Sequence, residues 1–353
     1  MLLTTVAAYA FAQTEVLSPV PSRDRKIVRR WALPGDPRGV ALGAGGTLYV
    51  GLAEPQAVIA IDPKTGAVKK RVILDSAEIA STKELVTLRT NPDRTRLYIA
   101  NGSDESATIL SLPNLAVLRE ITMEGEVIRD VLPDPQGRYI YIFGRKVHVF
   151  DSEGDTELRT LPIEDPMAIA VNSSGSLFAV VATEDFGSAK ATSVALYDTN
   201  TFAEVARDPL QTEKKIEAAM FAARDRSFVA LARDALFEKP LTTRPTRITG
   251  TNGETSMRVD IGDLVNSNHV CLPEGSGAQI ATLATTDTLL VYAERRCSAS
   301  GSFSGSSRGV TPASLYGVNA FALAYDADTN TLAATDRKGF LTIYNVPRPA
   351  TVR

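Results

Sequence analysis

The run Leu48-Tyr49-Val50-Gly51-Leu52, followed by Ala57-Val58-Ile59-Ala60-Ile61 and the turn Asp62-Pro63-Lys64-Thr65-Gly66, decides the fold of this 353-residue chain. Both apolar runs are short and rich in β-branched and aromatic residues, which is typical of β-strands. In the turn, Asp accepts a backbone hydrogen bond, Pro fixes φ and Gly supplies a left-handed residue. With strand-like segments at 37–42 and 68–74, the region predicts a unit of four short strands.

The same unit recurs along the chain. Each of the six later copies contains at least one clear strand-like segment. In chain order these are Leu97–Ala100, Tyr139–Phe143, Pro166–Val171, Glu217–Phe221, Gln279–Ala284 and Leu341–Asn345. A fixed period of this kind is the signature of architectures built from stacked supersecondary units. The recurrence therefore predicts a ring of small antiparallel sheets.

The two ends of the repeated region complete each other. The seventh copy stops at Pro347, one strand short, and Lys26–Leu33 supplies a strand before the first copy. Pairing them gives about 46 residues per unit, within the range of propeller blades. We predict an all-β fold, a seven-bladed β-propeller of four-stranded antiparallel blades over residues 26–347, with the ring closed by the N-terminal strand. The irregular fifth and sixth copies leave six or eight blades as alternatives.

The first copy resembles the repeat of the bacterial YVTN-type β-propeller family, which is WD-repeat-like and includes lactonase-like members. Its Tyr-Val strand, its apolar strand ending in Ile-Asp and its Thr-Gly turn carry the resemblance. Asp134-Pro135-Gln136-Gly137 and Asn172-Ser173-Ser174-Gly175 stand where the family has a Ser-Pro-Asp-Gly turn. The resemblance implies a propeller fold and often an exported bacterial protein. It implies no single activity, because propellers include binding modules and enzymes.

The chain ends and the cysteines bear on its location. Residues 1–12 are almost uncharged and apolar and end in Ala10-Phe11-Ala12, which predicts a signal-peptide remnant; the alternative is a disordered tail. We expect a linker over 13–25, a tail over 348–353, and a secreted or periplasmic protein. No apolar stretch is long enough for a membrane span. Cys271 and Cys297 form either one disulfide or two unrelated thiols.

Composition excludes several classes of function. The 38 basic residues are interspersed with 41 acidic ones and the net charge is −3, so we expect no nucleic-acid partner. His148 and His269 are the only histidines, too few for most metal or haem centres. For His148, on an apolar strand, we favour a structural role. Gly301-Ser302-Phe303-Ser304-Gly305 spells a nucleophile elbow but lies in a Ser/Gly-rich run. We therefore predict no catalytic residue, no metal site and no cofactor.

Ligands of propellers commonly bind where the innermost strands begin, at the mouth of the central channel. Aligning the copies there yields these candidate ligand-binding residues: Arg38, Glu84, Arg129, Asp165, Glu217, Asn268 and His269. The two arginines could grip an anion. Carboxylates at Asp36, Glu84 and Asp165 could hold a Ca²⁺ ion, the one cofactor that the pattern suggests. The alternative is that these charges pair with one another in a water-filled tunnel.

Long connections between second and third strands are expected in the fourth copy (183–193) and the fifth (233–245). The latter contains Phe237, Lys239 and Arg244, which we predict to contact a partner. The leading hypothesis is a non-catalytic exported scaffold, expected to be monomeric, that binds a protein or carbohydrate partner through this loop-rich face. The alternative is a lactonase-like hydrolase acting on a sugar lactone at the channel mouth.

Overall fold

The computed structural model describes the chain in segments. These are residues 15–21, 27–74, 87–101, 105–163, 165–185, 190–210, 212–213, 215–222, 225, 227–232, 236–241, 246–249, 255–261, 265–268, 280–283, 288–292, 313–315, 320–326, 331–336 and 338–345. The only helical element among them is a 3₁₀ turn, η1 (Ala44–Gly46). No described helix is long and apolar enough to cross a membrane.

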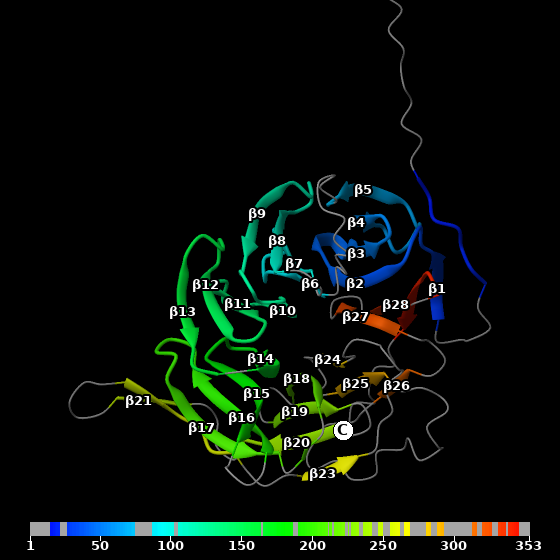
Figure 1. The fold of residues 1–353 in the computed structure, drawn as a ribbon. Helices are drawn as coiled ribbons and strands as arrows, with labels where there is room; N and C mark the ends of the chain where they lie inside the picture. The colour runs from blue at the N-terminus through cyan, green and yellow to red at the C-terminus, as the bar shows by residue number, and fades with distance from the viewer. Residues whose placement is uncertain are drawn as a thin grey trace, which may run out of the picture.

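The first four blades are regular four-stranded antiparallel sheets (Figure 1). Blade one consists of β2 (Pro37–Leu42), β3 (Leu48–Ala53), β4 (Gln56–Ile61) and β5 (Val68–Ile73). Blade two consists of β6 (Thr87–Thr90), β7 (Arg96–Ala100), β8 (Ser106–Ser111) and β9 (Val117–Thr122). Blade three consists of β10 (Asp130–Pro133), β11 (Tyr139–Phe143), β12 (Val147–Asp151) and β13 (Glu157–Leu161). Blade four consists of β14 (Pro166–Val171), β15 (Leu177–Asp185), β16 (Lys190–Asp198) and β17 (Glu204–Pro209).

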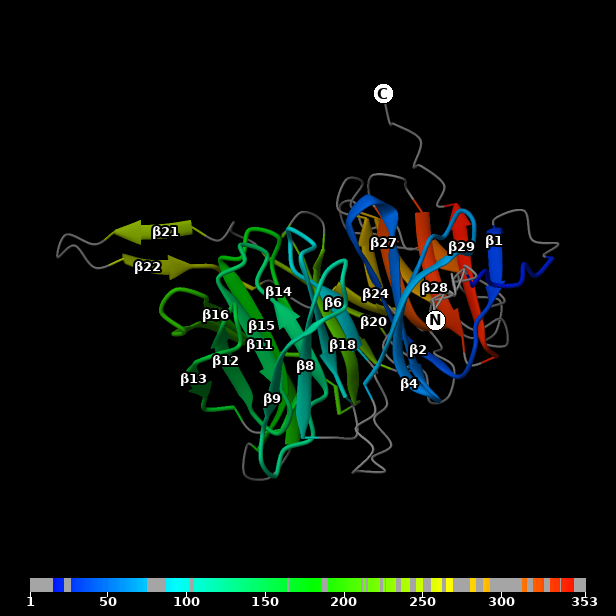
Figure 2. The ribbon, with the colours of Figure 1, turned by 90° about the horizontal axis from the view of Figure 1, so that it is seen from above.

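The fifth blade is interrupted. It consists of β18 (Ile216–Ala222), β19 (Ser227–Ala232), β20 (Leu236–Pro240) and β23 (Val265–Asn268). Between its third and fourth strands the chain forms a separate hairpin, β21 (Thr246–Thr249) with β22 (Thr255–Arg258). This hairpin extends outward beyond the blades in both views (Figures 1 and 2).

The remaining strands complete the ring. A three-stranded sheet follows, with β24 (Ile280–Leu283), β25 (Thr288–Tyr292) and β26 (Ala313–Leu315), the last paired parallel to β25. The sixth four-stranded sheet has the order β1-β29-β28-β27 and contains β27 (Ala320–Asp326), β28 (Thr331–Asp336), β29 (Phe340–Asn345) and β1 (Ile27–Ala32). The predicted closure by the N-terminal strand is therefore confirmed, since β1 pairs antiparallel with β29.

The innermost strands contact one another in a closed cycle. β2, β6, β10, β14, β18, β24 and β27 each contact the next, and β27 contacts β2. The β-propeller architecture is thus confirmed by six four-stranded antiparallel sheets arranged around a centre. The count of seven stays a prediction, because the sheet between the fifth and last blades contains three strands and is partly parallel.

Packing between blades follows from strand geometry, because alternate side chains of a strand point to opposite faces of its sheet. Tyr49 of blade one packs toward Leu97 of blade two, while Val50 beside it packs toward Ile343 of the last blade. Each of the first five blades buries at least one aromatic ring in its second strand, among them Tyr49, Tyr98, Tyr141, Phe178 and Phe228. The core is therefore a series of apolar layers between neighbouring sheets.

A strap formed by residues 15–20 crosses the seam between the last and first blades. Val16 bridges to Ala67, and Pro19 bridges to Trp31 of β1. Leu17 is buried in the apolar layer at the seam and donates its N–H to the Gly66 carbonyl at 2.9 Å. Residues 15–20 of the predicted linker (13–25) therefore pair through their backbone with both blades at the seam.

The predicted long connections are also corrected. Within 183–193, β15 and β16 continue their antiparallel pairing out to Asp185 and Lys190, so the excursion is mainly an extended hairpin. Within 233–245, residues 236–240 form β20, the third strand of blade five. Residues 236–240 read Leu-Phe-Glu-Lys-Pro, without the apolar-polar alternation of a half-buried strand, and the prolines at 240 and 245 suggest a loop instead.

Candidate functional site

Arg38 lies at the start of β2, as predicted, but its guanidinium is engaged within the protein. It forms an ion pair with Asp36 at 2.7 Å, and its side chain is only 15% exposed. Its carbonyl accepts a hydrogen bond from the Thr335 hydroxyl at 2.5 Å. The alternative in which the charges at the mouth pair with one another is therefore realised for Arg38 and Asp36.

Arg129 lies just before β10 and also contacts the neighbouring blade. Its Nη1 donates to the Pro166 carbonyl at 3.0 Å. Asp165 is exposed, has a positive φ of 44° and donates its N–H to the Arg145 carbonyl at 2.8 Å. On β6, the inner strand of blade two, Arg89 makes a bidentate pair with Asp130 of β10, at 2.7 and 3.1 Å. These contacts tie neighbouring inner strands together.

The other predicted mouth residues are described in part or not at all. Glu84 and His269 lie outside the described residues, while Glu217 and Asn268 are described by their backbones, in β18 and β23. In the described part of the chain, no three His, Cys, Asp or Glu side chains converge into a metal site. Because Glu84 lies outside that part, the suggested Ca²⁺ site stays a prediction.

The predicted partner-binding residues are corrected. Phe237 is 4% exposed and belongs to the apolar layer between blades four and five. Lys239 is 2% exposed and forms an ion pair with Asp208 of β17. Both side chains point into the sheet packing because β20 is a blade strand with neighbours on both faces. Arg244, Cys271 and Cys297 lie outside the described residues, so the disulfide stays a prediction.

His148 has the expected buried position on β12. Its Nδ1 lies 2.8 Å from Glu157 Oε1 and its Nε2 lies 3.3 Å from Glu126 Oε2. Burial alone would raise the pKa of Glu157, but hydrogen bonds from Thr160 and His148 hold it below its ordinary value. The imidazole of His148 therefore links the loop before blade three to the outer strands of that blade.

A pocket lies between blades two and three. Its volume is about 330 Å³, at the lower end of the roughly 300–1,000 Å³ of small-ligand sites. The lining residues come from three turns and three strands: Asn91, Pro92, Asp93, Thr95, Arg96, Tyr98, Pro133, Pro135, Gln136, Gly137, Tyr139, Ser152 and Glu153. Three prolines and two tyrosines among them give the pocket stiff walls.

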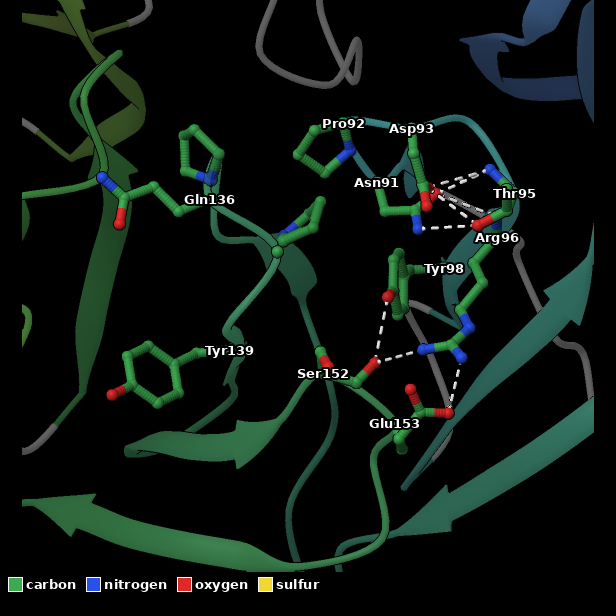
Figure 3. A pocket seen from close by; sticks show the side chains of 13 residues that line it. Asn91, Pro92, Asp93, Thr95, Arg96, Tyr98, Gln136, Tyr139, Ser152 and Glu153 are labelled. Atoms are coloured by element: carbon green, nitrogen blue, oxygen red, sulfur yellow. Dashed lines mark hydrogen bonds and ion pairs between the residues drawn. The ribbon is translucent and has the colours of Figure 1, made fainter.

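Arg96 joins the two sides of this pocket (Figure 3). From β7 of blade two it reaches blade three, where Nη1 donates to the Ser152 carbonyl at 2.9 Å and Nη2 contacts Glu153 Oε2 at 2.5 Å. The Tyr98 hydroxyl donates to the same carbonyl at 3.2 Å. The pocket floor is therefore fixed by hydrogen bonds that cross the blade boundary.

These contacts determine the electrostatics of the pocket. Burial opposes the charge of Arg96, but the carboxylate of Glu153 more than compensates and raises the pKa of the guanidinium. Burial raises the pKa of the Tyr98 phenol; Arg96 lowers it, whereas Glu153 and Asp93 raise it further. With two carboxylates and one guanidinium, the lining carries a formal net charge of −1.

The pocket opens at the end of the ring opposite the predicted mouth. Two of its turns, 91–95 and 134–138, join the first strand of a blade to the second, and the third turn, 152–156, joins a third strand to a fourth. These turns lie at the end of the blade where its first strand finishes, whereas the predicted mouth lies where the first strands begin. Sequence reasoning missed this site because its residues come from different copies of the repeat. The one available signal was the turn Asp134-Pro135-Gln136-Gly137, of which three residues line the pocket.

The comparisons with known proteins support the fold. No protein-family model matches the sequence, and no curated protein matches it. Kuenenia stuttgartiensis hydrazine synthase is similar in structure, with a TM-score of 0.58 and 14% identity, over 89% of this chain and 96% of that chain. The β-propeller domain of Myceliophteria thermophila Cps50 (Swd1) has a TM-score of 0.63 and 13% identity, over 94% of this chain and 100% of that chain. At such identities the likeness shows the fold alone, and that fold is a β-propeller.

Proposed function

We propose that this propeller is a non-catalytic scaffold that binds a protein or carbohydrate partner, and that the pocket between blades two and three is the contact site. The observation that carries the proposal is the pocket itself. It is concave, stiffened by three prolines and held by the contacts of Arg96 across the blade boundary. A preformed site of this kind loses little conformational entropy when it binds a ligand.

The position of the pocket also favours binding over structural use. Most of its lining comes from turns, which accept sequence variation without disturbing the sheets behind them. Asp93 and Pro92 are exposed at its rim, while Tyr98 behind them is 2% exposed. The blade boundary therefore presents turn side chains to solvent in front of a buried aromatic residue.

The test is a binding screen with a filled-pocket variant. Arrays of short peptides and of oligosaccharides are probed with the wild-type chain, with Ser152→Tyr, which places a ring in the pocket, and with Lys64→Tyr. Lys64 is the control because it is exposed in the Asp62–Gly66 turn, the counterpart in blade one of the turn that contains Ser152. Ligands retained by Lys64→Tyr and lost by Ser152→Tyr support the proposal. Absence of any ligand for the wild type, or equal retention by both variants, contradicts it.

Location is a second part of the proposal. The apolar run at residues 1–12 and the resemblance to YVTN-type repeats favour a secreted or periplasmic propeller. Fractionation of bacterial cells producing the full chain, followed by N-terminal sequencing of the mature protein, tests this. Export with cleavage near Ala12 supports the proposal, and an uncleaved protein confined to the cytosol contradicts it.

The lactonase-like alternative is less well supported by the geometry. It needs Arg38 and Arg129 to face a substrate, whereas Arg38 pairs with Asp36 and Arg129 donates to the Pro166 carbonyl. A lactone-hydrolysis assay with and without a chelator separates the two functions, since the scaffold is expected to show no hydrolysis in either condition.

A further inference from the structure

The side-chain donors of the pocket between blades two and three are largely engaged inside the protein. Asn91 Nδ2 donates to the Thr95 hydroxyl at 3.1 Å, and that hydroxyl donates to Asp93 Oδ1 at 2.8 Å. Gln136 Nε2 donates to the Ser174 carbonyl at 2.6 Å, outside the pocket lining. With Arg96 bound to Ser152 and Glu153, few N–H groups of the lining side chains remain for a ligand.

The backbone adds to this shortage of donors. Pro92, Pro133 and Pro135 line the pocket and have no N–H group. The N–H groups of Thr95 and Arg96 are also engaged, because both donate to Asn91 Oδ1, at 3.0 and 2.8 Å. A ligand with many acceptors, such as a phosphate or a carboxylate, would find the hydroxyls of Tyr139 and Ser152 but few N–H groups to bind its oxygens.

Acceptors, in contrast, remain. Among the contacts of the described residues, Asp93 uses only Oδ1 and Glu153 uses only Oε2 (Figure 3). Oδ2 of Asp93 and Oε1 of Glu153 can therefore each accept hydrogen bonds. Both carboxylates are accessible, with the Glu153 side chain 56% exposed. Their combined charge exceeds that of the single guanidinium, which favours a cationic ligand.

The walls suit a planar cation. Tyr139 lines the pocket with a half-buried ring, while Tyr98 is only 2% exposed. Aromatic rings such as that of Tyr139 attract guanidinium and ammonium groups through their faces. The ring of Tyr139 already has one such contact within the chain, with the Arg138 guanidinium carbon 5.1 Å from the ring centroid. The walls and the acceptors thus favour the same class of ligand.

We propose that the pocket binds the guanidinium or ammonium group of a basic residue in an extended segment of a partner protein. This inference rests on the proposed function and narrows it from protein or carbohydrate to a protein with an exposed basic segment. A sugar hydroxyl both donates and accepts, so an oligosaccharide would leave many of its acceptors without partners in this pocket. A basic side chain has only donors and matches what the pocket offers.

The test uses three capped pentapeptides, Gly-Ser-Xaa-Ser-Gly, in which Xaa is arginine, citrulline or glutamate. Citrulline has nearly the shape of arginine but no charge. Binding to the full chain is followed by saturation-transfer NMR and by titration at low salt, where charge contributes most. We expect the arginine peptide to bind about fivefold or more tightly than the citrulline peptide, and the glutamate peptide to bind weakest.

A pair of variants assigns the effect to the pocket. Glu153→Gln removes one carboxylate of the pocket, and Asp155→Asn makes the same change in charge two residues away, at a side chain that pairs with Arg119 outside the lining. We expect Glu153→Gln to weaken the arginine peptide about fivefold and Asp155→Asn to leave its affinity unchanged. Equal effects of the two variants overturn the inference, because they indicate that the peptide responds to the overall negative charge of this surface and not to the pocket.

Failure of the inference and failure of the proposed function give different results. If arginine and citrulline peptides bind equally, or oligosaccharides alone bind and are lost in Ser152→Tyr, the basic-residue inference is overturned and the binding scaffold stands. If no peptide or oligosaccharide binds the wild type, both are overturned.

Discussion

The indole nitrogen of Trp31 donates a hydrogen bond to the Pro63 carbonyl at 3.1 Å, across the seam where the ring closes. Trp31 lies on β1 of the last blade and Pro63 in the turn after β4 of blade one. The indole is buried, and Trp31 is the only tryptophan of the chain. Its fluorescence therefore reports directly on closure of the propeller.

Removal of residues 1–20 deletes the strap and is expected to weaken closure. Burial of Leu17 alone stabilises by about 1.5–3 kcal/mol, and the strap also forms backbone hydrogen bonds to both blades. We expect a lower Tm, measured by Trp31 emission during heating. Removal of residues 1–12 is the control and should leave Tm unchanged, because the strap begins at residue 15. Equal Tm values for the two truncations would show that the strap contributes nothing.

Gly66→Ala probes the same seam. Gly66 has φ of 74°, and a Cβ there would lie 2.8 Å from the Trp31 ring. Gly125→Ala is the matched control, with φ of 75° and nothing within 4 Å of the added Cβ. Both variants carry the cost of a left-handed alanine, about 1–2 kcal/mol, but Gly66→Ala should lose a further ~1–3 kcal/mol through overpacking. Urea unfolding measures the difference, and equal losses would place Trp31 away from the turn.

Much of this fold was predictable because the information is local. Asp62–Gly66 has the residue types that its turn requires, and Lys26–Leu33 could be matched to a blade that lacks a strand. The strap was not predictable, since Leu17 is one apolar residue in a Pro-containing segment without alternation. The strand β20 was not predictable either, because Pro240 and nearby prolines are typical of a loop. Its stability comes from pairing with neighbouring strands of the sheet.

The site was harder to predict than the fold. Arg38 and Arg129 do lie at the starts of inner strands, but their pairing with Asp36 and Pro166 depends on three-dimensional placement. The pocket joins Arg96 of one repeat copy to Glu153 of the next. Such a contact depends on how the blades pack against each other, so it cannot be predicted from the spacing of residues along the chain.

The Lys239–Asp208 ion pair predicts an asymmetric pair of variants. Asp208→Asn leaves a buried ammonium group without its counter-charge and should destabilise by about 2–3 kcal/mol, below the value for a fully buried pair because Asp208 is 31% exposed. Lys239→Met replaces the charge with an apolar chain of similar length and should cost less. Chemical unfolding at pH 7 measures both. Small and equal effects would indicate a surface pair, and so restore Lys239 as an accessible residue.

The contact of Glu157 with His148 predicts a dependence on pH. Because the pKa of Glu157 is held below its ordinary value of 4.5 in the folded chain, the ionised carboxylate stabilises the fold. This contribution is present above pH 4.5 and is lost as the pH falls through the lowered pKa. The difference in unfolding free energy between the wild type and Glu157→Gln should therefore shrink below pH 4.5. A difference that grows on acidification would contradict the assignment.

Occupation of the pocket between blades two and three is tested most directly by fluorine NMR of the chain labelled with 3-fluorotyrosine. Tyr98 and Tyr139 line the pocket, whereas Tyr49 and Tyr344 are buried elsewhere, and single Tyr→Phe variants assign the signals. On addition of the arginine pentapeptide, the account predicts saturable shifts of the Tyr98 and Tyr139 signals, with Tyr49 and Tyr344 unchanged. Binding that leaves the Tyr98 and Tyr139 signals unmoved would contradict it.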